Sequence, residues 1–108
     1  MSVPMEIEVE RLDAMRRAGE DHVLLDVREP WETDLVSVEG SLPIPMRMLP
    51  GHVAELPRDK PVVVMCHHGG RSAQVMMWLR EQGFDQATNL SGGIDAWARR
   101  IDPDMRTY

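Results

Sequence analysis

PVVVMCHHGGRS, residues 61–72, is the stretch that decides the fold. The three consecutive valines, Val62 to Val64, predict a strand that is buried on both faces, as in the middle of a parallel sheet. From Arg71 to Gln82, apolar side chains recur at helical spacing. The stretch therefore predicts a central strand, a short loop that contains Cys66, and a helix.

Weaker periodic segments alternate in the same way on either side of this stretch. Short strands are predicted at Met5–Glu8, His22–Val27, Ser41–Pro45 and Thr88–Leu90. Helices are predicted at 9–18, at Leu49–Leu56 with Pro50 in the first turn, and at Ile94–Ile101. Glu29–Asp34 is predicted to be a polar turn or a short helix. This alternation predicts an α/β fold with three layers, in which a mainly parallel sheet of about five strands has helices on both faces. Ligands of such sheets bind beyond the carboxyl ends of the strands, which is where Cys66 lies.

Size and composition restrict the class of protein. A chain of 108 residues, 43% of them hydrophobic, is enough for one domain, expected over residues 1–108. The net charge of −6 argues against a nucleic-acid partner, which needs a concentrated basic face. We find no apolar run long enough to span a bilayer, and Met1–Glu10 lacks the features of a signal peptide. A cytoplasmic protein with no membrane partner is expected.

The loop after the central strand combines features that suit a reactive thiol. Gly69 and Gly70 allow the backbone to turn tightly, so that loop amides can converge on one point near the start of the helix. A thiol at that point is expected to have a lowered pKa and to be largely a thiolate. Arg71 adds a planar fork suited to an oxyanion. The predicted ligand is therefore a small anion.

Cys66 has two competing interpretations, as a buried hydrophobic residue and as a metal ligand. A lone cysteine is more often a small buried hydrophobic residue, but the surrounding loop favours a functional role. His67 and His68 suggest a metal site with Cys66, yet adjacent residues rarely ligate one ion in good geometry. We therefore predict no metal, and expect both histidines to line the loop.

The spacing between Cys66 and Arg71 distinguishes two kinds of anion chemistry. Four residues separate them, whereas the cysteine-phosphatase signature places one more residue there. The shorter loop makes a tighter cradle, which suits a sulfur atom on the thiol better than a tetrahedral phosphate. This spacing favours sulfur transfer over phosphate transfer.

Four segments in order resemble the motifs of the rhodanese family, and the resemblance covers nearly the whole chain. They are Leu25–Glu32 (LDVREPWE), Gly40–Pro45 (GSLPIP), the loop Cys66–Arg71 and Asn89–Trp97 (NLSGGIDAW). The tail Ile101–Tyr108 also resembles the ends of rhodanese modules fused to ubiquitin-like-protein-activating enzymes, which hints at cofactor or tRNA thiolation.

The resemblance implies a sulfurtransferase in which Cys66 carries sulfur as a persulfide. The donor would be thiosulfate or another persulfide, and the acceptor would be cyanide, a thiol or a partner protein. No metal or organic cofactor would be needed. The loop residues that follow Cys66 would bind the substrate, namely His67, His68, Gly69, Gly70 and Arg71. Asp26, Arg28 and Ser72 would support the loop, the first two more as a structural ion pair than as reacting groups. Two alternatives stay open: a binding module without catalysis, and a cysteine phosphatase or arsenate reductase of related fold.

Overall fold

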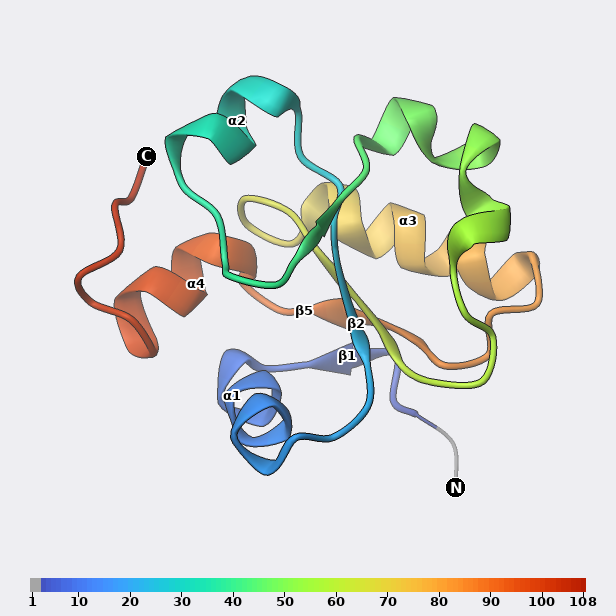
Figure 1. The fold of residues 1–108 in the computed structure, drawn as a ribbon, viewed down its shortest axis with the longest axis horizontal. Helices are drawn as coiled ribbons and strands as arrows, with labels where there is room; N and C mark the ends of the chain where they lie inside the picture. Colours follow the sequence, from blue (N-terminus) through green and yellow to red (C-terminus); the bar gives the residue numbers. More distant parts are fainter. Residues whose placement is uncertain (1–2) are drawn as a thin grey trace.

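A single parallel sheet organises the computed structural model, which describes residues 3–108 (Figure 1). The strands are β1 (Glu6–Ile7), β2 (Val23–Asp26), β3 (Leu42–Pro43), β4 (Val62–Met65) and β5 (Ala87–Leu90). The helices are α1 (Val9–Ala18), α2 (Pro30–Leu35), α3 (Gly70–Glu81) and α4 (Gly93–Arg100), with the 3-10 segments η1 (Met46–Gly51) and η2 (Val53–Glu55). The order β1-β5-β4-β2-β3 places β4 in the middle, which confirms the predicted fold class. Over residues 3–108, no helix is long and apolar enough to cross a membrane.

The register of β2 and β4 determines what lies at the carboxyl edge of the sheet. The two strands pair in parallel from Val23 opposite Val62 to Asp26 opposite Met65. Both strands therefore end at the same level. Cys66, which follows β4, is thus brought to the same edge as the chain that leaves β2.

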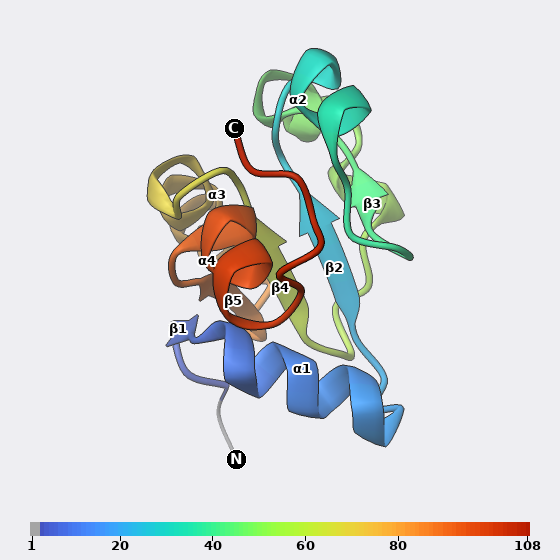
Figure 2. The same cartoon turned by 90° about the vertical axis from the view of Figure 1, so that its left-hand side faces the viewer.

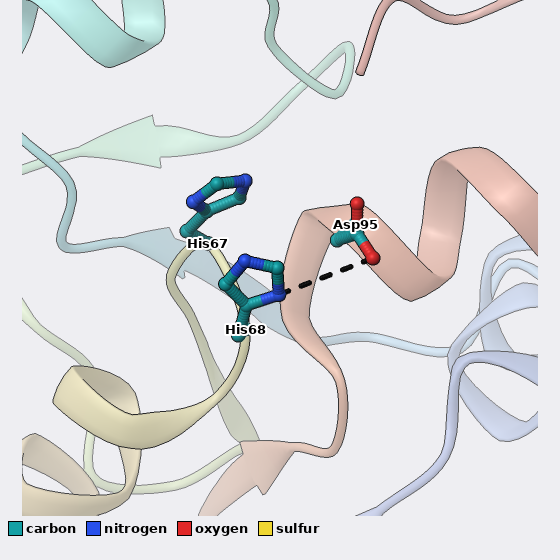
Figure 3. Close-up of side chains that lie close together, drawn as sticks. All are labelled: His67, His68 and Asp95. Atoms are coloured by element: carbon teal, nitrogen blue, oxygen red, sulfur yellow. Dashed lines mark ion pairs between the residues drawn. The ribbon is translucent and has the colours of Figure 1, made fainter. Parts of the chain in front are cut away.

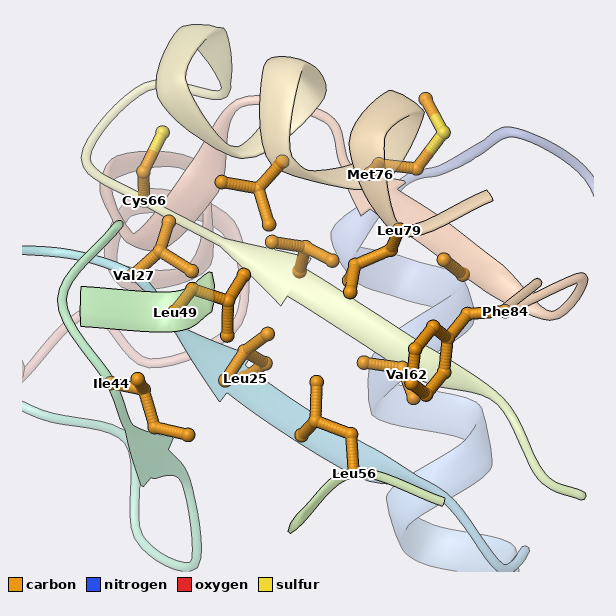
Figure 4. Close-up of a cluster of buried hydrophobic side chains, with 13 residues drawn as sticks. Leu25, Val27, Ile44, Leu49, Leu56, Val62, Cys66, Met76, Leu79 and Phe84 are labelled. Atoms are coloured by element: carbon orange, nitrogen blue, oxygen red, sulfur yellow. The ribbon is translucent and has the colours of Figure 1, made fainter. Parts of the chain in front are cut away.

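Alternate residues of the sheet pack against helices on opposite faces. On one face, Val62 and Val64 share a buried cluster with residues of α3 and η1, and Cys66 lies at the end of that cluster (Figure 4). On the other face, Val63 and Met65 pack with residues of α1 and α4. Figure 1 shows α1 and α3 on opposite sides of the strands. The run of valines is therefore buried on both faces, as its composition predicts.

The helix predicted over Leu49–Leu56 is wrong in type. The chain there forms η1 and η2, closed by bonds from the His52 N–H to the Leu49 carbonyl at 2.9 Å and from the Leu56 N–H to the Val53 carbonyl at 3.1 Å. Pro50 lies inside η1 rather than in the first turn of an α-helix. Proline has no N–H, and its ring crowds the carbonyl four residues earlier, so the turn that begins at Met46 cannot continue through Pro50 as an α-helix.

Candidate functional site

The sulfur of Cys66 lies inside the loop that leads into α3 (Figure 4). It accepts hydrogen bonds from the Gly69 N–H at 3.1 Å, the Ser72 N–H at 3.4 Å and the Ser72 hydroxyl at 3.2 Å. The loop can close this tightly because Gly69 has a φ of 109°, a conformation that a residue with a Cβ rarely adopts. The structure thus brings the loop amides to the thiol, together with Ser72, which was expected only to support the loop.

Burial and hydrogen bonding act in opposite directions on Cys66. Its side chain is buried, and burial alone raises the pKa of the thiol because it disfavours the charged form. The hydrogen bonds from Ser72, together with those from the backbone of Gly69 and His68, favour the thiolate and bring the pKa below its ordinary value. The site therefore stabilises a nucleophilic sulfur.

Replacing Ser72 by alanine is expected to raise the pKa of Cys66. The change removes the hydroxyl that hydrogen-bonds the sulfur but leaves the backbone amide in place. The thiolate then becomes dominant only at higher pH, which titration of its ultraviolet absorbance will show. Ser37→Ala is the matched control, because the Ser37 hydroxyl bonds the Thr33 carbonyl at the surface. An unchanged pKa in Ser72→Ala would contradict the role assigned to this hydroxyl.

The guanidinium of Arg71 is held by a carboxylate. It forms a bidentate pair with Glu32, with Nη1 donating to Oε2 at 2.7 Å and Nη2 donating to Oε1 at 2.8 Å. The Glu32 side chain is buried, and its hydrogen bonds with Arg71 lower its pKa to about 2 although burial opposes this. The pairing also raises the pKa of Arg71, to which the charge of Cys66 adds a smaller contribution. The fork of Arg71 is therefore oriented by Glu32 of α2.

Asp26 and Arg28 form an ion pair beneath the site. Both side chains are fully buried, and Nη2 of Arg28 donates to Oδ2 of Asp26 at 2.6 Å. The Arg28 guanidinium also donates to the backbone carbonyls of Glu32 at 3.2 Å and Val36 at 2.8 Å. The pair thus ties the end of β2 to α2. Its further contacts are with α2, the segment after it and the hydroxyl of Tyr108, and none of these bonds reaches the sulfur of Cys66.

The start of α4 forms hydrogen bonds with the backbone of the same loop. The Ile94 N–H donates to the Cys66 carbonyl at 2.9 Å, and the Asp95 N–H donates to the His67 carbonyl at 3.1 Å. From β5, the Asn89 side-chain amide donates to the Gly69 carbonyl at 3.2 Å. The carbonyls of Cys66, His67 and Gly69 therefore accept hydrogen bonds from α4 and β5. The amides of Gly69 and Ser72 are directed at the sulfur instead.

His67, His68 and Asp95 come close enough together to be considered as metal ligands (Figure 3). The two imidazoles pack against each other at an interplanar angle of 33°, with centroids 3.9 Å apart, and Asp95 already accepts from Arg99 at 3.0 Å. Ring nitrogens bind metals in the plane of the ring, so rings packed in this way do not direct their lone pairs at one point. His67 also uses Nε2 against the backbone oxygen of Tyr108 at 2.7 Å. This geometry does not fit a metal centre.

Two residues of the site escaped the sequence-based prediction. Glu32 lies in the quoted segment Leu25–Glu32, but nothing local shows that it pairs with Arg71. Tyr108 lies in the quoted tail, and its ring stacks on His67 with centroids 3.8 Å apart. The exposed His68 side chain lies 3.9 Å from Asp95. These contacts show where the two histidines lie but not what they bind, so substrate binding by His67 and His68 stays a prediction.

Comparison with known proteins identifies the family of this chain. The family model for the rhodanese-like domain matches residues 8–100. The chain belongs to the rhodanese-like family. A sulfurtransferase of Allochromatium vinosum is 39% identical to this rhodanese-like chain over 94 residues, covering 87% of this chain and 88% of the relative.

Longer proteins and solved structures agree with this assignment. The probable adenylyltransferase/sulfurtransferase MoeZ of Mycobacterium tuberculosis is 39% identical over 93 residues, which cover 84% of this rhodanese-like chain but only 24% of MoeZ. A rhodanese-related protein of Thermoplasma volcanium superposes with a TM-score of 0.81 at 33% identity, covering 91% of this chain and 94% of that one. The protein is therefore a rhodanese-like transferase of the sulfurtransferase group.

Proposed function

We propose that the protein transfers sulfane sulfur from a small anionic donor, thiosulfate or a persulfide, to a thiophilic acceptor through a persulfide on Cys66. The observation that carries this proposal is the sulfur of Cys66 receiving hydrogen bonds from Gly69 and Ser72 at 3.1–3.4 Å. Donors directed at one sulfur stabilise negative charge there, which suits both a thiolate and a persulfide anion. The acceptor would be cyanide, a thiol or a partner protein.

The first half of the cycle loads the sulfur. The Cys66 thiolate attacks the outer sulfur of thiosulfate, a new S–S bond forms, and the S–S bond of the donor breaks. Sulfite leaves with the electron pair of that bond, so the persulfide on Cys66 carries one added sulfur atom. The guanidinium of Arg71 has five N–H groups, and its pair with Glu32 leaves others for the oxygens of the donor.

The second half unloads it. Cyanide, a thiolate or a thiolate of a partner protein attacks the outer sulfur of the persulfide, and the Cys66 thiolate leaves with the bonding electrons. Because the enzyme is modified between the two substrates, ping-pong kinetics are expected. The cycle uses a free thiol, so we place the reaction in the reducing cytoplasm.

Intact-mass analysis tests the proposal directly. After exposure to thiosulfate or a persulfide donor, the wild type is expected to gain the mass of one sulfur atom and to lose it when cyanide is added, with thiocyanate released. Cys66→Ser is expected to show neither gain nor turnover, because a serine hydroxyl is not ionised at neutral pH. The chain has only one cysteine, so no other thiol can mimic the signal. Failure of the wild type to load sulfur from any donor would refute the proposal.

A further inference from the structure

The chain after α4 returns to the loop that contains Cys66. Residues 101–108, here called the C-terminal segment, run past α4 and end near α2 (Figure 2). There the Tyr108 hydroxyl bonds Glu32 of α2. Three of their side chains pack against the buried cluster that α1 and α4 share, namely Ile101, Met105 and Tyr108. The segment is thus anchored along its length, and the position of Tyr108 is fixed by packing.

Tyr108 contacts three parts of the site at once. Its hydroxyl donates to Oε1 of Glu32 at 2.9 Å and accepts from Nη1 of Arg28 at 3.0 Å. Its ring is parallel to the imidazole of His67, with an interplanar angle of 4°. Burial and the Glu32 hydrogen bond raise the pKa of Tyr108, so it stays a neutral donor at physiological pH. One side chain therefore joins α2, the buried ion pair and the residue after Cys66.

Glu32 connects Tyr108 to Arg71, because its carboxylate accepts hydrogen bonds from both side chains. Its Oε1 accepts from Tyr108 and from Nη2 of Arg71, and its Oε2 accepts from the backbone N–H of Glu29 and from Nη1 of Arg71. Two donors on each oxygen fix the plane of the carboxylate. Since a bidentate pair is coplanar, the plane of Glu32 sets the direction of the Arg71 fork.

We infer that Tyr108 is a positioning residue for the donor half-reaction, holding Glu32 so that Arg71 presents its remaining N–H groups to the oxygens of an oxyanion donor. The inference rests on the proposed sulfur transfer at Cys66. Without the Tyr108 hydroxyl, one oxygen of Glu32 loses a donor and the fork is held less rigidly. Cyanide has no oxygen for the fork to bind, so the acceptor half-reaction does not depend on this contact.

Steady-state kinetics with thiosulfate and cyanide separate this role from a general effect on folding. In a ping-pong cycle, kcat/KM for thiosulfate reports the loading step alone, and kcat/KM for cyanide reports the unloading step alone. Tyr108→Phe keeps the ring and removes only the hydroxyl. We expect it to lower kcat/KM for thiosulfate about three- to tenfold, the size of a typical net hydrogen-bond contribution, because the hydroxyl bonds Glu32 and not the donor itself. The value for cyanide is expected to stay within about twofold.

A second variant tests whether Tyr108 acts through Glu32. Glu32→Gln is expected to show at least as large a loss toward thiosulfate, because it disrupts the pair with Arg71 directly. Adding Tyr108→Phe to it is expected to cause little further loss, because the two changes break one chain of contacts. Thr107→Ala is the control from the same segment, since its side chain is exposed. This control is expected to match the wild type.

Each other result decides against the inference. Equal losses in kcat/KM for thiosulfate and for cyanide would indicate a merely structural effect. A Tyr108→Phe protein with unchanged kcat/KM for thiosulfate would show that the hydroxyl has no role. If the two losses multiplied in the double variant, Tyr108 would not act through Glu32 and Arg71. Sulfur loading of the wild type, followed by mass, is measured first. If the wild type does not load, the proposed function fails; if it loads and Tyr108→Phe behaves like it, only the role of Tyr108 fails.

Discussion

Gly93→Ala is expected to lower the free energy of unfolding by about 2 kcal/mol or more and to slow sulfur loading. Gly93 has a φ of 58°, where a residue with a Cβ is strained, and its added Cβ would lie 2.5 Å from the carbonyl oxygen of His67. The same Cβ would also collide with the carbonyl oxygen of Cys66. These two carbonyls accept the N–H groups of α4, so the collision pushes the helix and the loop apart.

Gly70→Ala is the matched control for stability, because it lies in the same loop region but without these constraints. A Cβ at Gly70 would meet nothing within 4 Å, and its φ is not in the left-handed region. Alanine is therefore expected to keep or slightly raise stability, by up to about 1 kcal/mol. Urea unfolding measures both variants, and the mass of the thiosulfate-treated protein follows the loading rate of Gly93→Ala. A Gly93→Ala protein as stable as Gly70→Ala would contradict the close packing described for α4.

The central part of the fold could be predicted because its signals are local. Three valines, a cysteine and two glycines in one stretch specify a buried strand, a tight loop and a helix start, and the structure has β4, the loop and α3 there. The thiol and its amide donors, Gly69 and Ser72, lie within six residues of one another, so the convergence of donors on Cys66 follows from the same stretch. Residues close together in the sequence were therefore enough to predict this strand, this loop and the start of this helix.

The partners of the loop could not be predicted in the same way, because they come from distant segments. Arg71 pairs with Glu32 across 39 positions, and Arg28 meets Tyr108 across 80. Sequence patterns show which residues carry charge but not which charges the register of the sheet brings together. The two loop glycines also differ in a way that their identity does not show: Gly69 needs its positive φ, whereas Gly70 is the first residue of α3.

Arg28→Met is expected to lower the free energy of unfolding by about 3–5 kcal/mol, the usual cost of leaving a buried charge without its partner. Arg28 and Asp26 have fully buried side chains, and the guanidinium is the group that neutralises the carboxylate. Methionine fills much of the space but offers no donor. The carbonyls of Glu32 and Val36 also lose a donor, which adds to the loss. Urea unfolding measures the change.

The double variant Asp26→Asn/Arg28→Met separates the unpaired charge from the lost packing. Asparagine removes the charge but keeps an oxygen for the backbone N–H of Arg28, which now bonds Oδ1 of Asp26 at 3.1 Å. If the pair is structural, the double variant is expected to recover at least half of the stability that Arg28→Met loses, because no charge is left buried. It is also expected to load sulfur at Cys66 once folded, since neither side chain bonds the sulfur. A double variant that folds stably but no longer loads sulfur would instead assign the pair a part in the reaction.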